Sequence, residues 1–459
     1  MKRALFLAFV SAPALASSNY TQDARDLSAS ALCGATNTAC QQSYTSGSKD
    51  GTAAFKRVLA TYKAIRAAEV PPAPPPPSPP APPPAPVPAP APAPSPAPPP
   101  PPSPPPAVDT TLHPLAFVPS PDVDINTELV PAWGTGAIPP KGFTGATPNL
   151  DDPGAFRFVC APAGLNYDDP IVYPNQPGKS HLHQYYGNTA INAASTYASI
   201  RTTGASTCNS PLNRSGYWEP AMLDGKGNVV RPDVNALYYK RYPKTHAYCT
   251  VGNPLYQGDC VPIPTGLRMI FGYNMQTMTA GGGYYNCTGP TATQAHYPAS
   301  QNGLRNAAAI CGSGNQLGMI ISAPDCWDGI HLDTPDHRSH MSYMKRDPNT
   351  GQMKCPATHP KVIPQLTLGV WYSVGPEGAT TWSLSSDDMP GMQMTPGSTF
   401  HADYFEGWDE RVKLMWEDNC INLRLNCSGG DLGNSKQLKM FSGFSIKANP
   451  RLVPVPPHP

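Results

Sequence analysis

The stretch QLTLGVWYSV, residues 365–374, alternates between apolar and other side chains along most of its length. Successive side chains of a β-strand point to opposite faces, so a period of two gathers one apolar set on a single face. That set is Leu366, Leu368, Val370, Tyr372 and Val374. The stretch therefore predicts a β-strand with one buried face.

Two further segments, 267–271 and 317–321, repeat the period of two. Their alternating apolar residues are Leu267, Met269 and Phe271, and Leu317, Met319 and Ile321. Gly, Pro, Asn and Asp interrupt such runs at short intervals, and no long helical stripe lies between them. We therefore expect a mainly β large domain over residues 108–459, built as a β-sandwich or jelly-roll with long, disulfide-pinned loops.

The N-terminus has the pattern of a secretory signal peptide over residues 1–16. Lys2 and Arg3 precede an apolar run, and Ala14-Leu15-Ala16 supplies the small residues of a cleavage site before Ser17. We therefore expect an extracellular protein, and no later apolar stretch approaches the length of a membrane span. Four N-x-[ST] sequons are acceptors for N-glycosylation in a eukaryotic host, at Asn19, Asn213, Asn286 and Asn426.

Twelve cysteines agree with export, because an even number of thiols in an oxidising compartment is most simply a set of disulfides. The pairs nearest along the chain are Cys33 with Cys40, Cys249 with Cys260, and Cys420 with Cys427. The others would then pair among themselves: Cys160, Cys208, Cys287, Cys311, Cys326 and Cys355. A zinc–thiolate site is the weaker alternative, since no C-x-x-C pair occurs.

Two regions precede the large domain. Residues 17–70 carry an apolar helical stripe, formed by Phe55, Val58, Leu59, Tyr62 and Ile65, which predicts a small helical, disulfide-stapled module. It could be a docking domain or only a capped helical hairpin. Residues 71–107 are almost entirely Pro, Ala and Ser and predict a polyproline II linker of about 110 Å. The linker resembles the hydroxyproline-rich, O-glycosylated stalks of plant and green-algal wall glycoproteins; an unmodified linker is the alternative.

Net charge excludes some partners. With 32 basic against 31 acidic residues, nothing favours binding to nucleic acid or to an anionic membrane surface.

Histidines and aspartates gather in a few short segments of the large domain. His181 and His183 are spaced by two, which on a strand aims both imidazoles at one side, and His401 and Asp403 repeat that spacing. A third segment, 326–340, contains Asp328, His337 and His340. We expect the imidazoles of His181, His183, His337, His340 and His401 to lie within roughly 10 Å of one another.

The same segments resemble a known family. Asp169-Pro170-Ile171-Val172, Ser180-His181-Leu182-His183, Cys326-Trp327-Asp328-Gly329, Asp336-His337-Arg338-Ser339-His340, His359-Pro360 and His401-Ala402-Asp403 look like the domain of unknown function DUF1996 over about residues 150–425. That family comprises secreted proteins, many of them fungal and often joined to a WSC carbohydrate-binding module. The resemblance implies a wall-associated extracellular protein and brings no established activity. No WSC module is apparent in this chain.

The sequence is compatible with three functions. The first is a polysaccharide-active hydrolase or lyase, with Asp328, His337, His340 and Asp403 as catalytic residues. In that hypothesis the metal ligands, for zinc or copper, are His181, His183, His401 and His359, and the sugar-stacking rings are Trp327, Trp408, Tyr185 and Tyr186. Paired carboxylates for glycoside cleavage would come from Asp328, Asp333, Asp387, Asp388, Asp403 and Glu406. The second is a non-catalytic module binding wall glycan or glycoprotein, and the third is a copper-handling protein.

Overall fold

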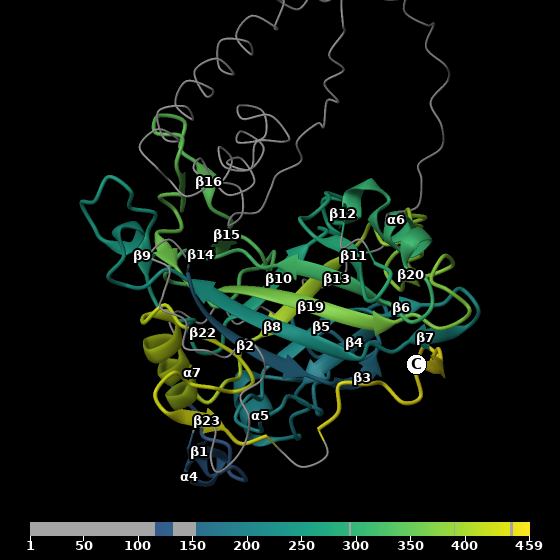
Figure 1. Ribbon diagram of the computed structural model, residues 1–459, viewed down its shortest axis with the longest axis horizontal. Coiled ribbons are helices and arrows are strands. Elements are labelled where there is room, and N and C mark those ends of the chain that lie inside the picture. The colour runs from purple at the N-terminus through teal and green to yellow at the C-terminus, as the bar shows by residue number, and fades with distance from the viewer. Residues whose placement is uncertain (1–114, 132–152, 293–294, 390, 441–443) are drawn as a thin grey trace, which may run out of the picture. The chain divides into compact units, whose positions relative to one another are not determined.

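The computed structural model describes residues 115–131, 153–292, 295–389, 391–440 and 444–459 (Figure 1). All of these belong to the compact unit Pro102–Pro459. The predicted signal peptide, helical module and polyproline linker lie outside the described residues and stay predictions. Strands dominate the described part, so the expected mainly β fold is confirmed.

The larger sheet has seven strands in the order β12-β11-β13-β19-β8-β2-β22. Its central strand, β19 (Gln365–Ser373), is the stretch whose alternation predicted a strand, and its even-numbered apolar residues are at most 1% exposed. Adjacent strands are antiparallel except for the pair β2 and β22. The other bounds are β12 Tyr297–Pro298, β11 Tyr284–Thr288, β13 Gln316–Ser322, β8 Val234–Arg241, β2 Gly154–Cys160 and β22 Asn426–Cys427.

A second sheet of five antiparallel strands has the order β10-β21-β5-β4-β3. Its bounds are β10 Arg268–Gly272, β21 His401–Phe405, β5 Gly216–Pro220, β4 His183–Gly187 and β3 Pro162–Asn166. In Figure 1, β10, β5 and β4 appear behind the broad strands β13, β19, β8 and β2 of the first sheet.

The two sheets share one apolar core, as expected of a sandwich. Alternate residues of the five-stranded sheet enter it, among them Tyr217 of β5 and Ala402 and Tyr404 of β21. They pack in the same cluster as Leu368 and Val370 of β19. Because side chains alternate along a strand, the neighbours of these core residues point to the opposite, outer face of the five-stranded sheet. That outer face positions the candidate site.

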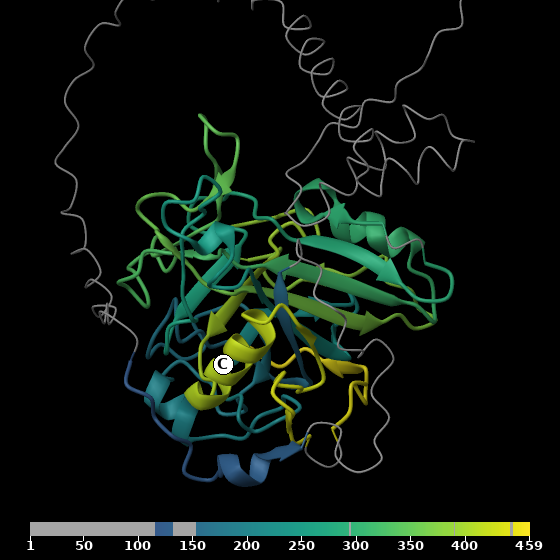
Figure 2. The same cartoon turned by 60° about the vertical axis from the view of Figure 1, so that its left-hand side comes forward.

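Smaller elements surround the sandwich. Helix α6 packs beside β11 and β12, and the α7–η3 region packs beside β2; Figure 2 brings α7 to the front. The helices are α4 Ile125–Glu128, α5 Tyr197–Thr202, α6 Gly303–Ile310 and α7 Glu410–Trp416, with short helical turns η1 Ala247–Cys249, η2 Ala299–Gln301 and η3 Glu417–Ile421. The minor sheets are formed by β1 Leu129–Pro131 with β23 Lys436–Leu438; by β15 Met341–Ser342, β14 Cys326–Trp327, β18 Lys361–Val362 and β9 Asp259–Cys260; by β16 Lys345–Arg346 with β17 Met353–Lys354; and by β20 Ser383–Leu384, β6 Met222–Leu223, β7 Asn228–Val230 and β24 Leu452–Pro454. In the described part of the chain, no helix has both the length and the apolar character that crossing a membrane requires.

Every cysteine in the described residues is in a disulfide. The pairs are Cys160–Cys208, Cys249–Cys260, Cys287–Cys311, Cys326–Cys355 and Cys420–Cys427. The two short-range pairs expected here are confirmed, as is the pairing of the other six among themselves; the expected pair Cys33–Cys40 lies outside the described residues.

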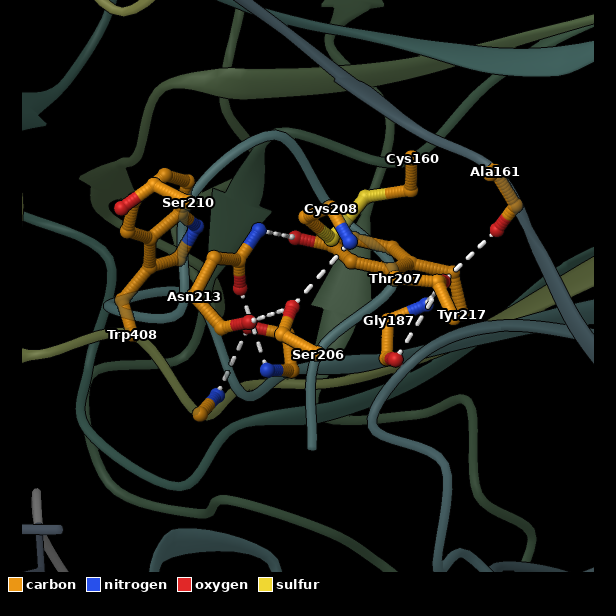
Figure 3. The surroundings of a disulfide bond; sticks show 12 residues. Cys160, Ala161, Gly187, Ser206, Thr207, Cys208, Ser210, Asn213, Tyr217 and Trp408 are labelled. Carbon is orange, nitrogen blue, oxygen red and sulfur yellow. Dashed lines mark hydrogen bonds between the residues drawn. A yellow bond between two sulfur atoms is a disulfide. The ribbon is translucent and has the colours of Figure 1, made fainter. Parts of the chain in front are cut away.

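The bridge between Cys160 and Cys208 fixes a loop that is also held by polar contacts (Figure 3). Ser206 donates a hydrogen bond from its hydroxyl to the carbonyl oxygen of Asn213 at 2.6 Å, and the amide of Asn213 donates to the Tyr217 hydroxyl at 3.0 Å. Asn213 is wholly buried, so this sequon is not accessible in the folded chain.

Candidate functional site

The candidate site lies on the outer face of the five-stranded sheet, where β4 and β21 both begin. His183 is the first residue of β4, and His181 precedes it by two residues. His401 opens β21, and Asp403 follows on the same side of the strand because Ala402 between them faces the core. The two short motifs found in the sequence therefore supply side chains to one place.

Three imidazoles meet there. The Nε2 atoms of His181 and His401 are 3.2 Å apart. One ring nitrogen from each of His181, His183 and His401 lies within 4.8 Å of the others. The expected convergence therefore holds for these three histidines.

Hydrogen bonds at Nδ1 decide which ring nitrogen carries the proton. His183 Nδ1 lies 3.1 Å from the Asp168 carbonyl oxygen, and His401 Nδ1 lies 2.8 Å from the Thr399 carbonyl oxygen. A carbonyl oxygen can only accept, so both Nδ1 atoms donate and both Nε2 atoms carry lone pairs.

His181 reaches the same state through Ser385. The Ser385 hydroxyl donates to the Leu182 carbonyl oxygen, which leaves Oγ free to accept from His181 Nδ1 at 3.2 Å. All three imidazoles therefore keep an Nε2 lone pair, which is the form in which neutral histidines bind a metal ion.

Burial keeps these imidazoles neutral. Desolvation lowers the pKa of His181 to about 4 and that of His401 to about 3, and it lowers the pKa of His183 well below the ordinary value. Neighbouring imidazoles lower the pKa values of His183 and His401 further. Unprotonated Nε2 atoms 3.2 Å apart direct lone pairs at each other, and a cation between them would turn this repulsion into attraction.

Two carboxylates complete the cluster. Both oxygens of Asp403 are buried without a hydrogen-bond partner among the described residues. Burial, and then the charge of Asp169, raises the pKa of Asp403 well above its usual range. Burial raises the pKa of Asp169 to about 6, although Asp169 Oδ1 accepts from the amides of Ile171 and Val172.

Asp169, His183 and Asp403 also form a group with ligand atoms within 4.8 Å. This group shares His183 with the three imidazoles, so the nitrogen and oxygen donors form two adjoining groups. Unpartnered buried carboxylate oxygens are costly unless a cation or proton satisfies them. The donor set therefore fits a metal ion, and the cluster is a candidate metal centre.

A pocket of about 80 Å³ opens over this cluster. It is large enough for an ion and several waters. Its lining residues are Asp169, Val172, Tyr173, Ser180, His181, Ile270, Asn274, Met275, Gln276, Asp336, His337, Arg338, Met389, His401 and Asp403.

The wall of the pocket contains an oriented histidine. His337 lies 3.0 Å through Nδ1 from Asp333 Oδ1, and Arg268 pairs with the other Asp333 oxygen at 3.6 Å. Asp333 is 1% exposed, and His337 has the positive φ of 55° that is uncommon for a residue with a side chain. Because the carboxylate accepts the Nδ1 proton, the neutral form of the His337 imidazole has its lone pair on Nε2.

Other predicted site residues lie elsewhere. His340 contacts the Arg268 carbonyl oxygen through Nε2 and the Thr334 hydroxyl through Nδ1, so both of its ring nitrogens serve the packing of the loop. His359 contacts the Ser339 carbonyl oxygen through Nε2 at 2.8 Å. Neither residue lines the pocket, which argues against the metal role of His359 and the catalytic role of His340 expected from the sequence.

Asp328 also lies outside the pocket. It closes a turn, because one oxygen accepts from the amides of Ile330 and His331 and the other contacts His331 Nδ1 at 2.6 Å. These contacts account for Asp328 structurally and argue against its expected catalytic role.

The four aromatic residues expected to stack on sugar are buried. Trp408 and Tyr186 have no exposed surface, and Tyr186 donates to Glu219 Oε1 at 2.6 Å. Tyr185 stacks on the buried Trp218, and Trp327 donates its indole hydrogen to a backbone carbonyl oxygen at 2.6 Å. None of the four presents a ring face to the pocket, which argues against the stacking role.

Sequence reasoning missed Asp169, Asp333 as the partner of His337, and the Asp168 and Thr399 carbonyl groups that orient the imidazoles. Asp169 occurs in one of the segments that resemble DUF1996, and this was the available signal. The backbone carbonyl groups that orient the imidazoles cannot be identified from the sequence, because every residue has one.

Comparison with known proteins gives one result. The sequence profile described as the domain of unknown function DUF1996 matches residues 169–408, slightly more than half of the 459 residues. This range contains all five donors of the candidate metal centre. Neither the curated proteins nor the solved structures contain a match. The chain therefore belongs to the DUF1996 family.

Proposed function

We propose that this protein is a metal-dependent, hydrolase-like enzyme that acts on polysaccharide or wall glycoprotein outside the cell. The observation that carries the proposal is that His181, His401 and the partnerless carboxylate of Asp403, all members of the donor cluster, line an open pocket. Structural metal sites are closed off by protein, whereas catalytic sites keep a position open to solvent or substrate. The pocket that opens beside His181, His401 and Asp403 therefore favours catalysis over loop-pinning.

The donor set suits zinc or copper. His181, His183 and His401 would supply nitrogen and Asp403 oxygen, with Asp169 as a further oxygen donor. Imidazole is preferred by these borderline ions, whereas calcium and magnesium prefer all-oxygen sites. A bound divalent ion would supply a water of lowered pKa at the pocket floor.

His337 is suited to move a proton beside that position. Its Nδ1 donates to Asp333, and the ion pair with Arg268 holds Asp333 in place. This arrangement leaves Nε2 to accept a proton from a nucleophile and return it to a leaving group, as oriented histidines do in hydrolytic enzymes. Since His337 lines the pocket, we assign it as the general base.

A mechanism with two carboxylates is less well supported. Of the carboxylates expected from the sequence, only Asp403 lines the pocket. Glu406 is ion-paired with Lys413 at 3.1 Å, and Asp387 accepts the amide hydrogens of Leu384 and Gly397. Metal-assisted cleavage therefore takes precedence over an acid-and-nucleophile pair.

The pocket limits how a substrate could bind. A polymer would lie across the open pocket and present one bond or substituent to His181, His401 and Asp403. Tyr173, Asn274 and Gln276 line the pocket and provide the aromatic and amide groups that suit hydroxyl-rich ligands. The five disulfides fit an extracellular setting.

The test is product analysis on a panel of wall polysaccharides, using full-length protein loaded with zinc or copper. We expect soluble fragments from at least one substrate, their loss after chelation, and their loss in His183→Ala and His337→Ala. His359→Ala is the matched control, because this imidazole lies outside the pocket, and it should retain activity. Equal product yield from His183→Ala and wild type, or no product from any substrate, would contradict the proposal.

A further inference from the structure

Five methionines occur in two short segments, and each segment contributes one of them to the pocket. The first loop, 274–279, contains Met275 and Met278, and the second, at 389–394, contains Met389, Met392 and Met394. Each loop thus has a pair of methionines three residues apart. Together they hold five of the chain's 14 methionines in two short segments.

Both loops contribute to the pocket over the histidine cluster. Met275 and Met389 line the same cavity as His181 and His401. The first loop is tightly closed, because the amide of Asn274 donates to the Thr279 carbonyl oxygen at 2.9 Å and the Thr279 amide donates back at 3.3 Å. In the second loop, the amide of Met392 donates to the Met389 carbonyl oxygen at 2.8 Å.

Core packing does not explain these side chains. Buried methionines of this protein, such as Met269 and Met319, belong to the apolar core and are at most 1% exposed. None of the five loop methionines belongs to an apolar cluster of the described residues, and Met278 is 50% exposed. Burial of apolar surface stabilises these side chains little at such positions. The property that distinguishes methionine there is the thioether sulfur.

Thioether sulfur is a soft ligand that selects Cu(I) over harder divalent ions. No thiolate competes in this part of the chain, because every described cysteine is in a disulfide. We propose that Met275 and Met389, which line the pocket, form a Cu(I)-binding site together with Met278, Met392 and Met394 of the same two segments. This site is distinct from the nitrogen and oxygen donors at the floor and stands independently of the enzymatic proposal.

Members of the two donor sets lie in one pocket. Met275 and Met389 line the same cavity as His181 and His401, so an ion held by the thioethers lies beside the imidazoles. Cu(I) is accepted by both sulfur and imidazole ligands and can pass between them without changing its oxidation state. The methionine loops would thus favour copper as the ion that reaches the floor.

The test is a competition titration of Cu(I) under anaerobic conditions against a chromophoric Cu(I) chelator, with full-length protein. Two variants remove the thioethers of one segment each: Met275→Leu/Met278→Leu, and Met389→Leu/Met392→Leu/Met394→Leu. We expect each to weaken Cu(I) binding roughly tenfold or more, because losing even a residue that only hydrogen-bonds to a metal ligand has an effect of that size. Zinc affinity should not change, because zinc at the floor uses nitrogen and oxygen. Leucine preserves size and apolar character, so folding should be retained.

Met353→Leu is the matched control: this methionine is 37% exposed on β17, away from the pocket, and its loss should leave Cu(I) affinity unchanged. X-ray absorption of the Cu(I)-loaded protein should show sulfur bound to copper. Unchanged Cu(I) affinity in both loop variants, or a copper shell of nitrogen alone, would overturn the proposal. A protein that binds Cu(I) through sulfur but releases no product would refute only the enzymatic proposal.

Discussion

Glu219 offers a test of the electrostatics of the sandwich core. It is wholly buried between the sheets, where the hydroxyls of Tyr186 and Tyr372 donate to Oε1 at 2.6 and 3.2 Å. Its Oε2 has no hydrogen-bond partner among the described residues. Burial raises the pKa of Glu219 to about 8, against an ordinary value of 4.5.

The sign of the resulting pH dependence follows from proton counting. Between pH 4.5 and 8 the folded state keeps the Glu219 proton that the unfolded state has lost, so the free energy of unfolding falls as pH rises. From pH 4.5 to pH 7 the loss is about 3 kcal/mol at 1.36 kcal/mol per pH unit. The loss is complete once pH exceeds the folded-state value.

Glu219→Gln should remove this loss, because glutamine imitates the protonated carboxyl and never ionises. The difference in unfolding free energy between variant and wild type should grow in favour of the variant by about 3 kcal/mol between pH 4.5 and pH 7. The assay is chemical denaturation at several pH values with the disulfides intact.

Glu406→Gln is the matched control, since Glu406 is equally buried but pairs with Lys413 at 3.1 Å. Its loss should destabilise the protein at neutral pH by leaving an ammonium group unpaired. If Glu219→Gln gave a difference that did not vary with pH, Glu219 would be ionised in the folded state and the reasoning would be refuted.

Three further predictions concern other parts of the chain. Replacing Cys160 and Cys208 by serine opens a link across 48 residues and should cost about 4 kcal/mol of unfolding free energy by denaturation; an unchanged midpoint would contradict this. Asp333→Asn should lower kcat far more than it raises KM, by roughly 10²–10⁴-fold, with unchanged metal content; a change in KM alone would argue against the general base. After secretion from a eukaryotic host, peptide mass mapping should find glycan on the exposed Asn426 and none on the buried Asn213, where a glycan would block folding.

The strands could be predicted because their signal is local. A period of two along residues 365–374 directly encodes one buried face, and the same spacing in His181-Leu182-His183 and His401-Ala402-Asp403 directs paired side chains to one side. His183 begins β4 and His401 begins β21 of the same sheet, so the side chains of the two pairs converge. The short-range disulfides Cys249–Cys260 and Cys420–Cys427 were likewise predictable from proximity along the chain.

The residues that the sequence could not place depend on loop geometry and depth. His337 and His340 are three residues apart, yet the positive φ of His337 accompanies its position on the pocket wall while His340 contacts backbone. Trp408 has the same side chain as a sugar-stacking residue, and only its complete burial against Phe158 identifies it as core. Residue type cannot separate these environments.

The most direct test of the central claim is zinc binding by the full-length protein, measured by element analysis and by competition titration. Zinc binds to imidazole nitrogen and carboxylate oxygen, so this measurement reports on the His and Asp cluster and not on the thioethers. We expect a single zinc ion bound to wild type and to His359→Ala, and its loss from both His183→Ala and His401→Ala. Wild-type protein that binds no zinc, or a His183→Ala variant that binds it as tightly as wild type, would contradict the metal centre.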